Sequence, residues 1–350
     1  MSDAPDPAGD GPNPASDGPD PAIPFPPMEA ELVRELPAGE GWQYEPKWDG
    51  FRGVLENVGG ELALWSRNAR PLLRYFPELR PLGELLPPRS ALDGEIVIVR
   101  DGALDFDAMQ MRLHPAESRI RRLSGEIPAE FVAFDVLLWV DEPVWRRPLE
   151  ERRAELERVA KGFRLSPAVA DLDEARRWLD RFEALGLDGV IAKRLGVPYL
   201  PGSREGVVKV KEMKTADCVV VGIRWKGERE AVATLLLGLY GDDGEIDYVG
   251  SAAVAARTRA EVAAKVLPLV EDAPDHRFSE PNRWGGGELE QAPLRPELVV
   301  EVRYDKVQGN RFRHGTKLLR WRDDKDPSDC TWLELRPARA PGESVAALFD

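Results

Sequence analysis

Short apolar runs separated by turn residues begin at Met28 and continue to about residue 211. They are rich in β-branched and aromatic residues, which favours strands. The runs are 63–66, 92–99, 131–138, 189–192 and 207–211. Between them, apolar residues at Ala175, Trp178, Leu179, Phe182 and Leu185 recur at helical spacing. Gly186 follows as a stop signal. The pattern predicts an α+β domain with one strong helix.

After Lys214 the apolar runs become more numerous and helices rarer. Strands are expected at 218–223, 234–240, 247–250, 299–304, 317–321 and 331–335, with one helix at 260–270. This arrangement favours a small closed barrel of the OB type, and a generic β-sandwich fits it as well. The predicted boundary lies near Thr215, which gives domains 28–214 and 215–350.

Composition places the chain among folded proteins without a disulfide framework. It is 43% hydrophobic and 31% charged. Residues 1–27 hold nine prolines, three glycines, five aspartates and no lysine or arginine, which predicts a disordered tail. Cys218 and Cys330 are expected to be reduced, and the three histidines lack zinc-ligand spacing. Without a basic leader or an apolar run of ~20 residues, we expect a cytoplasmic protein away from the membrane.

Lys47 is the residue with the clearest chemical potential. It lies between Pro46 and Trp48, and Asp49 and Gly50 follow, so its amine is expected at a turn beside a pocket. A protonated lysine is a poor nucleophile, and nearby cations or burial are needed to free its lone pair. Taken alone, the pattern fits a solvated turn lysine equally well.

Further motifs follow in a fixed order. They are Ser66-Arg67-Asn68, Asp93-Gly94-Glu95, Phe134-Asp135, Asp188-Gly189 and Lys209-Val210-Lys211. Strand parity places Lys209 and Lys211 on one face, which would be unusual in a buried strand unless that face meets an anion. Each motif alone is explained by a structural role, whereas their joint order is far more specific.

This series resembles the ordered motifs of the covalent nucleotidyltransferase superfamily, which includes ATP-dependent DNA ligases, RNA ligases and capping enzymes. Within it the chain is most similar to the short bacterial ATP-dependent DNA ligases of the LigC type. The segments 44–52, 74–79, 114–119 and 300–305 carry the closer likeness. The resemblance covers about residues 28 to 340 and implies an adenylation domain followed by an OB-fold domain.

The resemblance implies that Lys47 attacks the α-phosphate of ATP, that AMP then passes to a DNA 5′-phosphate, and that a 3′-hydroxyl displaces it. Positioning and charge neutralisation would dominate such catalysis. The implied roles are as follows: Lys209 and Lys211 on the α-phosphate, Arg52 on ribose or phosphate, Glu45 on the adenine amino group, Phe134 stacked on the base, and Arg67 on AMP or the DNA end. Glu95 is implied to hold the ribose or a metal, and Asp188 to bind Mg²⁺ or Mn²⁺.

Two positions depart from the family pattern. Many relatives carry glutamate where this chain has Asp188, which shortens the reach and favours a water-bridged metal contact. Ala69 stands where glycine is frequent, so the local turn is expected to differ.

Near the C-terminal end, Arg322-Asp323-Asp324-Lys325 resembles the R-x-D-K motif of ligase OB domains. By that resemblance, Arg322 and Lys325 would close over the nucleotide and orient pyrophosphate during the first step. The alternative is a solvated charged turn.

The net charge of −14 argues, by itself, against a nucleic-acid partner. Residues 303–322, however, carry seven cationic side chains against Asp305 alone. Within this basic ribbon, the residues expected to bind DNA, together with Arg67, are Arg303, Lys306, Arg311, Arg313 and Lys317. A salt-bridged surface ribbon is the alternative.

The sequence thus predicts a monomeric ATP-dependent ligase of nicked duplex DNA that works with other repair proteins near the nucleoid. One alternative is an RNA ligase or a GTP-dependent capping enzyme with the same lysine chemistry. Another is a non-catalytic OB-fold DNA-binding protein. An NAD-dependent ligase is disfavoured because zinc-type cysteine spacing is absent.

Overall fold

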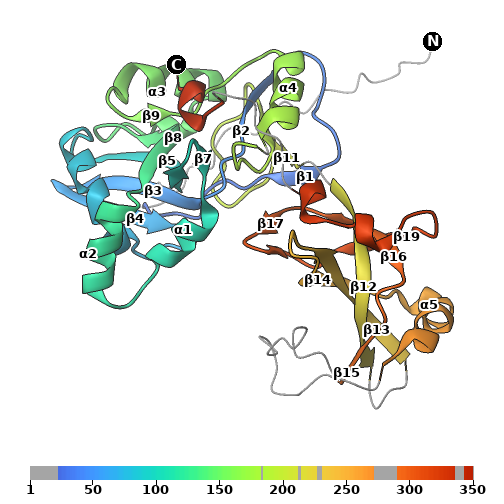
Figure 1. The fold of residues 1–350 in the computed structure, drawn as a ribbon. Helices are drawn as coiled ribbons and strands as arrows, with labels where there is room; N and C mark the ends of the chain where they lie inside the picture. The colour runs from blue at the N-terminus through green and yellow to red at the C-terminus, as the bar shows by residue number, and fades with distance from the viewer. Residues whose placement is uncertain are drawn as a thin grey trace, which may run out of the picture.

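The computed structural model describes residues 23–182, 184–211, 214–226, 231–271, 290–335 and 343–349. Figure 1 shows two bodies, one blue to green and one yellow to red, with the C-terminal end returning to the first. Helices and mixed sheets together confirm the predicted α+β class.

The first body is built around a five-stranded sheet with strand order β4-β3-β5-β8-β9. The bounds are β3 Phe51–Val58, β4 Glu61–Ser66, β5 Ser90–Val97, β8 Glu130–Leu138 and β9 Arg164–Leu165. β5 lies between two neighbours and is buried along nearly its whole length, including the carboxyl side chain of Asp93. In the register, Arg52 of β3 lies opposite Glu95 of β5.

A second sheet of this body has strand order β1-β11-β10-β2. The bounds are β1 Glu31–Val33, β2 Trp42–Pro46, β10 Val190–Arg194 and β11 Val207–Val210. The predicted helix is α4, Leu172–Phe182, whose buried Ala175, Trp178 and Phe182 share a core cluster with Tyr44 and Val190 of this sheet. The other elements here are α1 Phe106–Arg112, α2 Glu117–Glu126, α3 Leu149–Val159 and the hairpin β6 Val99–Arg100 and β7 Ala103–Leu104.

The second body starts with β12, Lys214–Lys226, and its main sheet follows the order β14-β13-β12-β16-β19. The remaining bounds are β13 Ala231–Tyr240, β14 Ile246–Ala253, β15 Gln291–Pro293, β16 Val299–Tyr304, β17 Val307–Gln308, β18 Arg311–Phe312, β19 Lys317–Trp321 and α5 Arg259–Val266. Among the described residues the strands do not pair into a closed ring: the two ends of the sheet meet only through the isolated bridge Ala252–Thr316. In the described part of the chain, β14 and the segment just before β19 are thus joined by that bridge.

Part of the predicted N-terminal tail packs on the first body. Residues 1–22 of that tail lie outside the described residues. Phe25, in contrast, is buried, with its ring centroid 6.0 Å from that of Trp145 and 6.1 Å from that of Tyr199. The prediction of disorder for residues 1–27 uses the composition of the whole segment, in which prolines and aspartates predominate. Such an average does not reveal that one residue, Phe25, is buried.

Candidate active site

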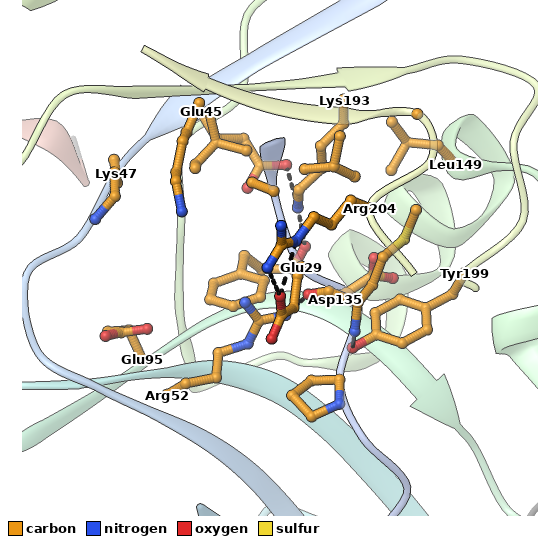
Figure 2. Close-up of a pocket in the computed structure, with 18 of the residues that line it drawn as sticks. Glu29, Glu45, Lys47, Arg52, Glu95, Asp135, Leu149, Lys193, Tyr199 and Arg204 are labelled. Carbon is orange, nitrogen blue, oxygen red and sulfur yellow. Dashed lines mark hydrogen bonds and ion pairs between the residues drawn. The ribbon is translucent and has the colours of Figure 1, made fainter. Parts of the chain in front are cut away.

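A cavity of about 530 Å³ lies between the two sheets of the first body (Figure 2). Side chains from both sheets line it. The predicted nucleotide-site residues found there are Glu45, Lys47, Arg52, Arg67, Glu95, Phe134 and Lys209. The structure therefore brings together residues that are separated by up to about 160 positions in the sequence.

Lys47 follows directly after the end of β2 and is held by its backbone. Its N–H donates to the carbonyl of Gly189 at 2.8 Å, and the Asp188 N–H donates to the Lys47 carbonyl at 2.9 Å. Gly189 has φ +128°, and a Cβ there would lie 2.1 Å from the carbonyl oxygen of Val210. Only glycine fits this crossing of three chain segments, which explains the Asp-Gly pair of the motif.

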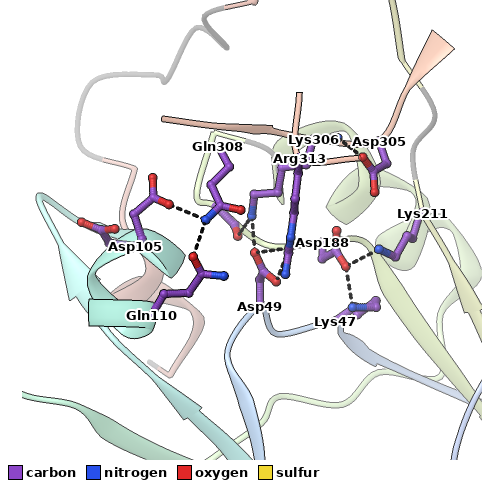
Figure 3. A network of polar contacts seen from close by, with 12 residues as sticks. Lys47, Asp49, Asp105, Gln110, Asp188, Lys211, Asp305, Lys306, Gln308 and Arg313 are labelled. Carbon is purple, nitrogen blue, oxygen red and sulfur yellow. Dashed lines mark hydrogen bonds and ion pairs between the residues drawn. The ribbon is translucent and has the colours of Figure 1, made fainter. Parts of the chain in front are cut away.

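Asp188 connects the nucleophile candidate to a second lysine. The Nζ atoms of Lys47 and Lys211 lie 2.5 and 2.7 Å from the same Asp188 Oδ2 (Figure 3). Burial of the carboxyl opposes its ionisation, but the attraction of the two ammonium groups prevails and lowers the pKa of Asp188 to about 2. Lys211 thus stands beside Lys47 without lining the cavity itself.

Glu45 is buried at the side of the cavity, where Lys193 Nζ lies 2.7 Å from its Oε1 and Gln43 donates to the same atom at 2.8 Å. The Lys193 ammonium also stands 4.9 Å from the centre of the Phe134 ring. The sequence analysis gives Lys193 no role. The signal for one is a lysine at the end of an apolar strand, a residue type that is rarely buried unless it is paired.

Arg52 lies across Phe134 and is fixed by a buried acid. Its Nε and Nη2 donate to the two oxygens of Asp93 at 2.6 and 2.5 Å, and Tyr199 donates its hydroxyl to Asp93 at 2.6 Å. The guanidinium carbon lies 4.5 Å from the centre of the Phe134 ring. Bidentate pairing leaves this planar cation little freedom. Sequence reasoning assigns no role to Asp93 or Tyr199, which support Arg52 from behind.

Glu95 is the second predicted metal ligand. Burial outweighs the attraction of Arg52 and Lys47 and raises the pKa of this carboxyl to about 7. Among the described residues, no cluster of three metal-ligating side chains occurs. A divalent cation held by one carboxylate and the phosphate oxygens of a nucleotide fits such a donor set.

Asp49 joins the two bodies two residues after Lys47. Lys306 donates to its carboxylate and to the Gly186 carbonyl, the latter at 3.0 Å, and Arg313 donates to the carboxylate at 3.1 Å (Figure 3). The Arg313 guanidinium also covers the ring of Phe106 at 4.0 Å. Two of the predicted DNA-binding cations are thereby engaged in the contact between the bodies.

Comparison with known proteins identifies the family. The model described as "ATP dependent DNA ligase domain" matches residues 27–211, and "ATP dependent DNA ligase C terminal region" matches residues 228–325. The chain is 45% identical to DNA ligase C2 of Mycolicibacterium smegmatis and 43% identical to DNA ligase C of Mycobacterium tuberculosis, in each case over 89% of this chain and 94% of the relative. The chain belongs to the ATP-dependent DNA ligase family. It is an enzyme of the short LigC type, and the predicted resemblance is confirmed.

A solved structure of a Lig E DNA ligase supports the fold. It aligns with a TM-score of 0.52 at 16% identity and covers 84% of this chain and 100% of its own. At that identity the likeness concerns the fold, an adenylation domain followed by an OB-fold domain. No helix among the described residues is long and apolar enough to cross a membrane.

Arg322 and Lys325 of the ligase do not line the cavity of the first body. Arg322 Nη1 and Lys325 Nζ are 2.5 and 3.1 Å from the Asp217 carboxylate of β12, and Arg322 also donates to Asp324. Sequence reasoning gives Asp217 no role, since no local pattern links it to a turn more than 100 residues later. In this arrangement the motif faces the ligase's own second domain.

The rest of the basic ribbon is divided among several contacts. Arg311 lies 5.2 Å from the centre of the Tyr248 ring, and Arg320 pairs with Glu301 at 2.6 Å. Arg303 and Lys317 are register partners on β16 and β19, and Lys317 is exposed. The ribbon is therefore partly a salt-bridged surface and partly a domain contact.

Ala69 adopts φ +54°. This left-handed backbone conformation, two residues after Arg67, costs about 1 kcal/mol for a residue other than glycine.

We expect Asp188→Asn to change the acid sensitivity of the ligase. A folded-state pKa of about 2 lies below the ordinary 3.8, so the ionised carboxylate stabilises the fold above about pH 4. That contribution disappears as the pH falls from about 4 towards 2. Between pH 5 and pH 3 the free energy of unfolding should therefore drop by about 1 kcal/mol more for the wild type than for the variant.

Urea unfolding at pH 7, 5 and 3 measures this difference. Asp141→Asn is the control, because the exposed Asp141 pairs only with the exposed Arg89 in the described structure. Parallel pH profiles for the wild type and Asp188→Asn would contradict the assignment.

Proposed function

We propose that this ligase seals 5′-phosphate/3′-hydroxyl nicks in duplex DNA through a lysine-AMP intermediate on Lys47. The observation that carries the proposal is the position of the Lys47 amine, at the edge of the cavity and within a cluster of cations. Lys209 lines the same cavity, and Lys211 shares the Asp188 carboxylate. In-line displacement at phosphorus needs a positioned nucleophile and neutralised phosphate oxygens, and this arrangement can supply both.

In the first step the unprotonated Nζ of Lys47 would attack the α-phosphorus of ATP, and pyrophosphate would leave with the bonding pair. Asp188 accepts a hydrogen bond from the ammonium form and orients the nitrogen, and the protons that the nitrogen loses would pass to the departing pyrophosphate or to water. The DNA 5′-phosphate would then displace Lys47 from AMP, and the 3′-hydroxyl would displace AMP from the DNA end. Each step breaks one P–N or P–O bond and forms one P–O or P–N bond.

We assign the nucleotide contacts as follows. The adenine would enter between Glu45 and Phe134, and Lys193 would hold the ionised form of Glu45. Arg52 would lie on the ribose or α-phosphate, and Lys209 and Lys211 on phosphate oxygens. Arg67, at the cavity lining, would meet AMP or the DNA end. The support for these roles is the geometry of the cavity, in which every group except Lys211 lines the wall.

A magnesium ion, or manganese in its place, would neutralise phosphate oxygens when bound. Glu95 fits that role better than Asp188, because the Asp188 carboxylate already accepts from two ammonium groups. A cation would also lower the cost of ionising the buried Glu95 carboxyl.

For DNA we propose that Arg303, Arg311 and Lys317 contact phosphates, and that Lys306 and Arg313 help by docking the second domain on Asp49. Domain boundaries at 28–214 and 215–350 are part of the proposal. So is a monomer that cooperates with other repair proteins at chromosomal nicks, which would place it with the nucleoid in the cytoplasm.

The covalent step is tested with radiolabelled nucleotide. Wild-type ligase incubated with α-labelled ATP and Mg²⁺ should acquire a label that survives denaturation, and Lys47→Ala should acquire none. Lys161→Ala, which changes an exposed lysine away from the cavity, is the matched control and should label normally. Labelling from GTP alone would favour the capping alternative, and equal labelling of Lys47→Ala would overturn the assignment.

Salt dependence separates the two roles proposed for the ribbon. Lys317→Ala should reduce the slope of log affinity for nicked DNA against log salt by about 1, because a phosphate contact is lost. Lys306→Ala should weaken sealing but leave the slope nearly unchanged, since its ammonium is bonded to Asp49. The slopes come from binding titrations in ~50 to 200 mM salt. Identical slope changes in the two variants would refute the division of roles.

Arg322→Ala and Lys325→Ala test whether the motif acts in the first step. If the second domain rotates to bring this motif to the nucleotide, both variants should slow self-adenylylation more than sealing of pre-adenylylated nicks. Single-turnover assays of the two steps give the comparison. Equal losses in both steps would count against that closing role.

A further inference from the structure

We propose that the C-terminal segment 343–349 positions the nucleophile, with Phe349 acting through Trp48 on Lys47. The inference rests on the proposed function, in which Lys47 forms and breaks a bond to AMP. The segment follows the second domain in sequence but packs on the first (Figure 1). It would make a residue near the end of the chain part of the catalytic apparatus of the adenylation domain.

Three contacts anchor the segment along its length. Glu343 accepts from Arg181 of α4 at 2.8 Å, and the Val345 N–H donates to the Gly102 carbonyl, between β6 and β7, at 2.8 Å. The Val345 side chain is 1% exposed and belongs to the core cluster that contains Trp48. Anchors on separate elements fix both the place and the direction of the segment.

Phe349 completes the segment by stacking on Trp48. The two rings are 5.4 Å apart between centroids and only 11° from parallel. Arg164 of β9 lies 4.9 Å from the centre of the Phe349 ring. This contact places the stack against the five-stranded sheet, whose residues also line the cavity.

Trp48 is also fixed through its indole nitrogen. Its Nε1 donates to the hydroxyl of Ser166 at 2.9 Å, and the residue is 5% exposed. Ser166 accepts the indole N–H and Phe349 stacks on the face of the ring, so the Trp48 side chain has one favourable orientation. Rotation would break a buried hydrogen bond and the stack together.

The fixed indole matters because Trp48 directly follows Lys47. The Lys47 backbone is hydrogen-bonded on its other side to residues 188 and 189. A shift of Trp48 would therefore be passed to the Lys47 Cα, and the nucleophile is sensitive to such shifts: a displacement of ~1 Å can cost as much as 100-fold in rate. Phe349 touches no reacting atom, so it is a positioning residue.

This role predicts a loss that depends on the reaction step. Lys47 reacts when the enzyme takes up AMP and when it delivers AMP to DNA, but the final displacement by the 3′-hydroxyl needs no bond to it. Removal of the stack should thus impair labelling and leave sealing of pre-adenylylated nicks largely intact. A merely structural loss of folded enzyme would impair both equally.

The test compares Phe349→Ala, Phe349→Leu and Phe349→Tyr in the full chain, with single-turnover labelling by ATP and sealing of pre-adenylylated nicks as paired readouts. For Phe349→Ala we expect labelling to slow about fivefold, as the loss of an aromatic pair predicts, and sealing to change less than about twofold. Phe349→Tyr should restore labelling because it keeps the ring. Phe349→Leu should remain impaired, because it keeps apolar volume but no stack.

Phe76→Leu is the matched control. It removes a buried ring from a separate core cluster, where the ring contacts Phe51 and Arg112, so it reports the effect of destabilisation, and melting temperatures of all variants accompany the rates. Unchanged labelling in Phe349→Ala, or equal losses in the two readouts, would overturn the inference. Absence of labelling in the wild type would instead refute the proposed function.

Discussion

The shared carboxylate of Asp188 is the interaction on which the rest of the site depends. An ionised carboxylate away from water is costly unless strong partners compensate, and here two ammonium groups converge on one oxygen. The backbone that follows Asp188 also passes close to Lys47 and Val210, which requires glycine at position 189. The ion pairs of Asp188 and the absence of a side chain at Gly189 thus bring Lys47, the end of β11 and the start of β10 together.

The same pairing recurs around the cavity. Glu45 holds Lys193 and Asp93 holds Arg52, so each of these cations has an acidic partner before a nucleotide arrives. Pairing keeps several cations at close range without large mutual repulsion. A polyphosphate that approached these two paired cations would compete with the carboxylates already bound to them. The free energy gained on binding would therefore be the difference between the cation–phosphate pairs that form and the cation–carboxylate pairs that break. A metal ion that neutralises part of the phosphate charge would change that difference.

Much of the candidate site could be predicted from the sequence, because its motifs are short and local. The residues that hold these motif residues in place could not be predicted in the same way. Tyr199 bonds to Asp93 and Asp217 bonds to Arg322, and each pair is more than 100 residues apart in the sequence. Helix α3 was not predicted for a related reason: Arg152 occupies a core position that periodicity reserves for an apolar residue, and only its pairing with Asp135 of β8 makes that burial acceptable. The orientation of Arg322 was equally beyond reach, because its partner Asp217 in β12 lies more than 100 residues earlier in the same domain.

The motif from Lys47 to Gly50 is specific because each residue meets a different part of the chain. Lys47 forms an ion pair with Asp188, and Trp48 donates to Ser166 and stacks on the C-terminal segment. Asp49 forms ion pairs with two cations of the second domain. At Gly50 a Cβ would lie 2.0 Å from the Ile96 carbonyl oxygen, which leaves room only for glycine. Four successive residues thus satisfy four unrelated tertiary constraints. A change in either the docking of the second domain or the packing of the C-terminal segment would act on a residue within two positions of Lys47, the proposed nucleophile.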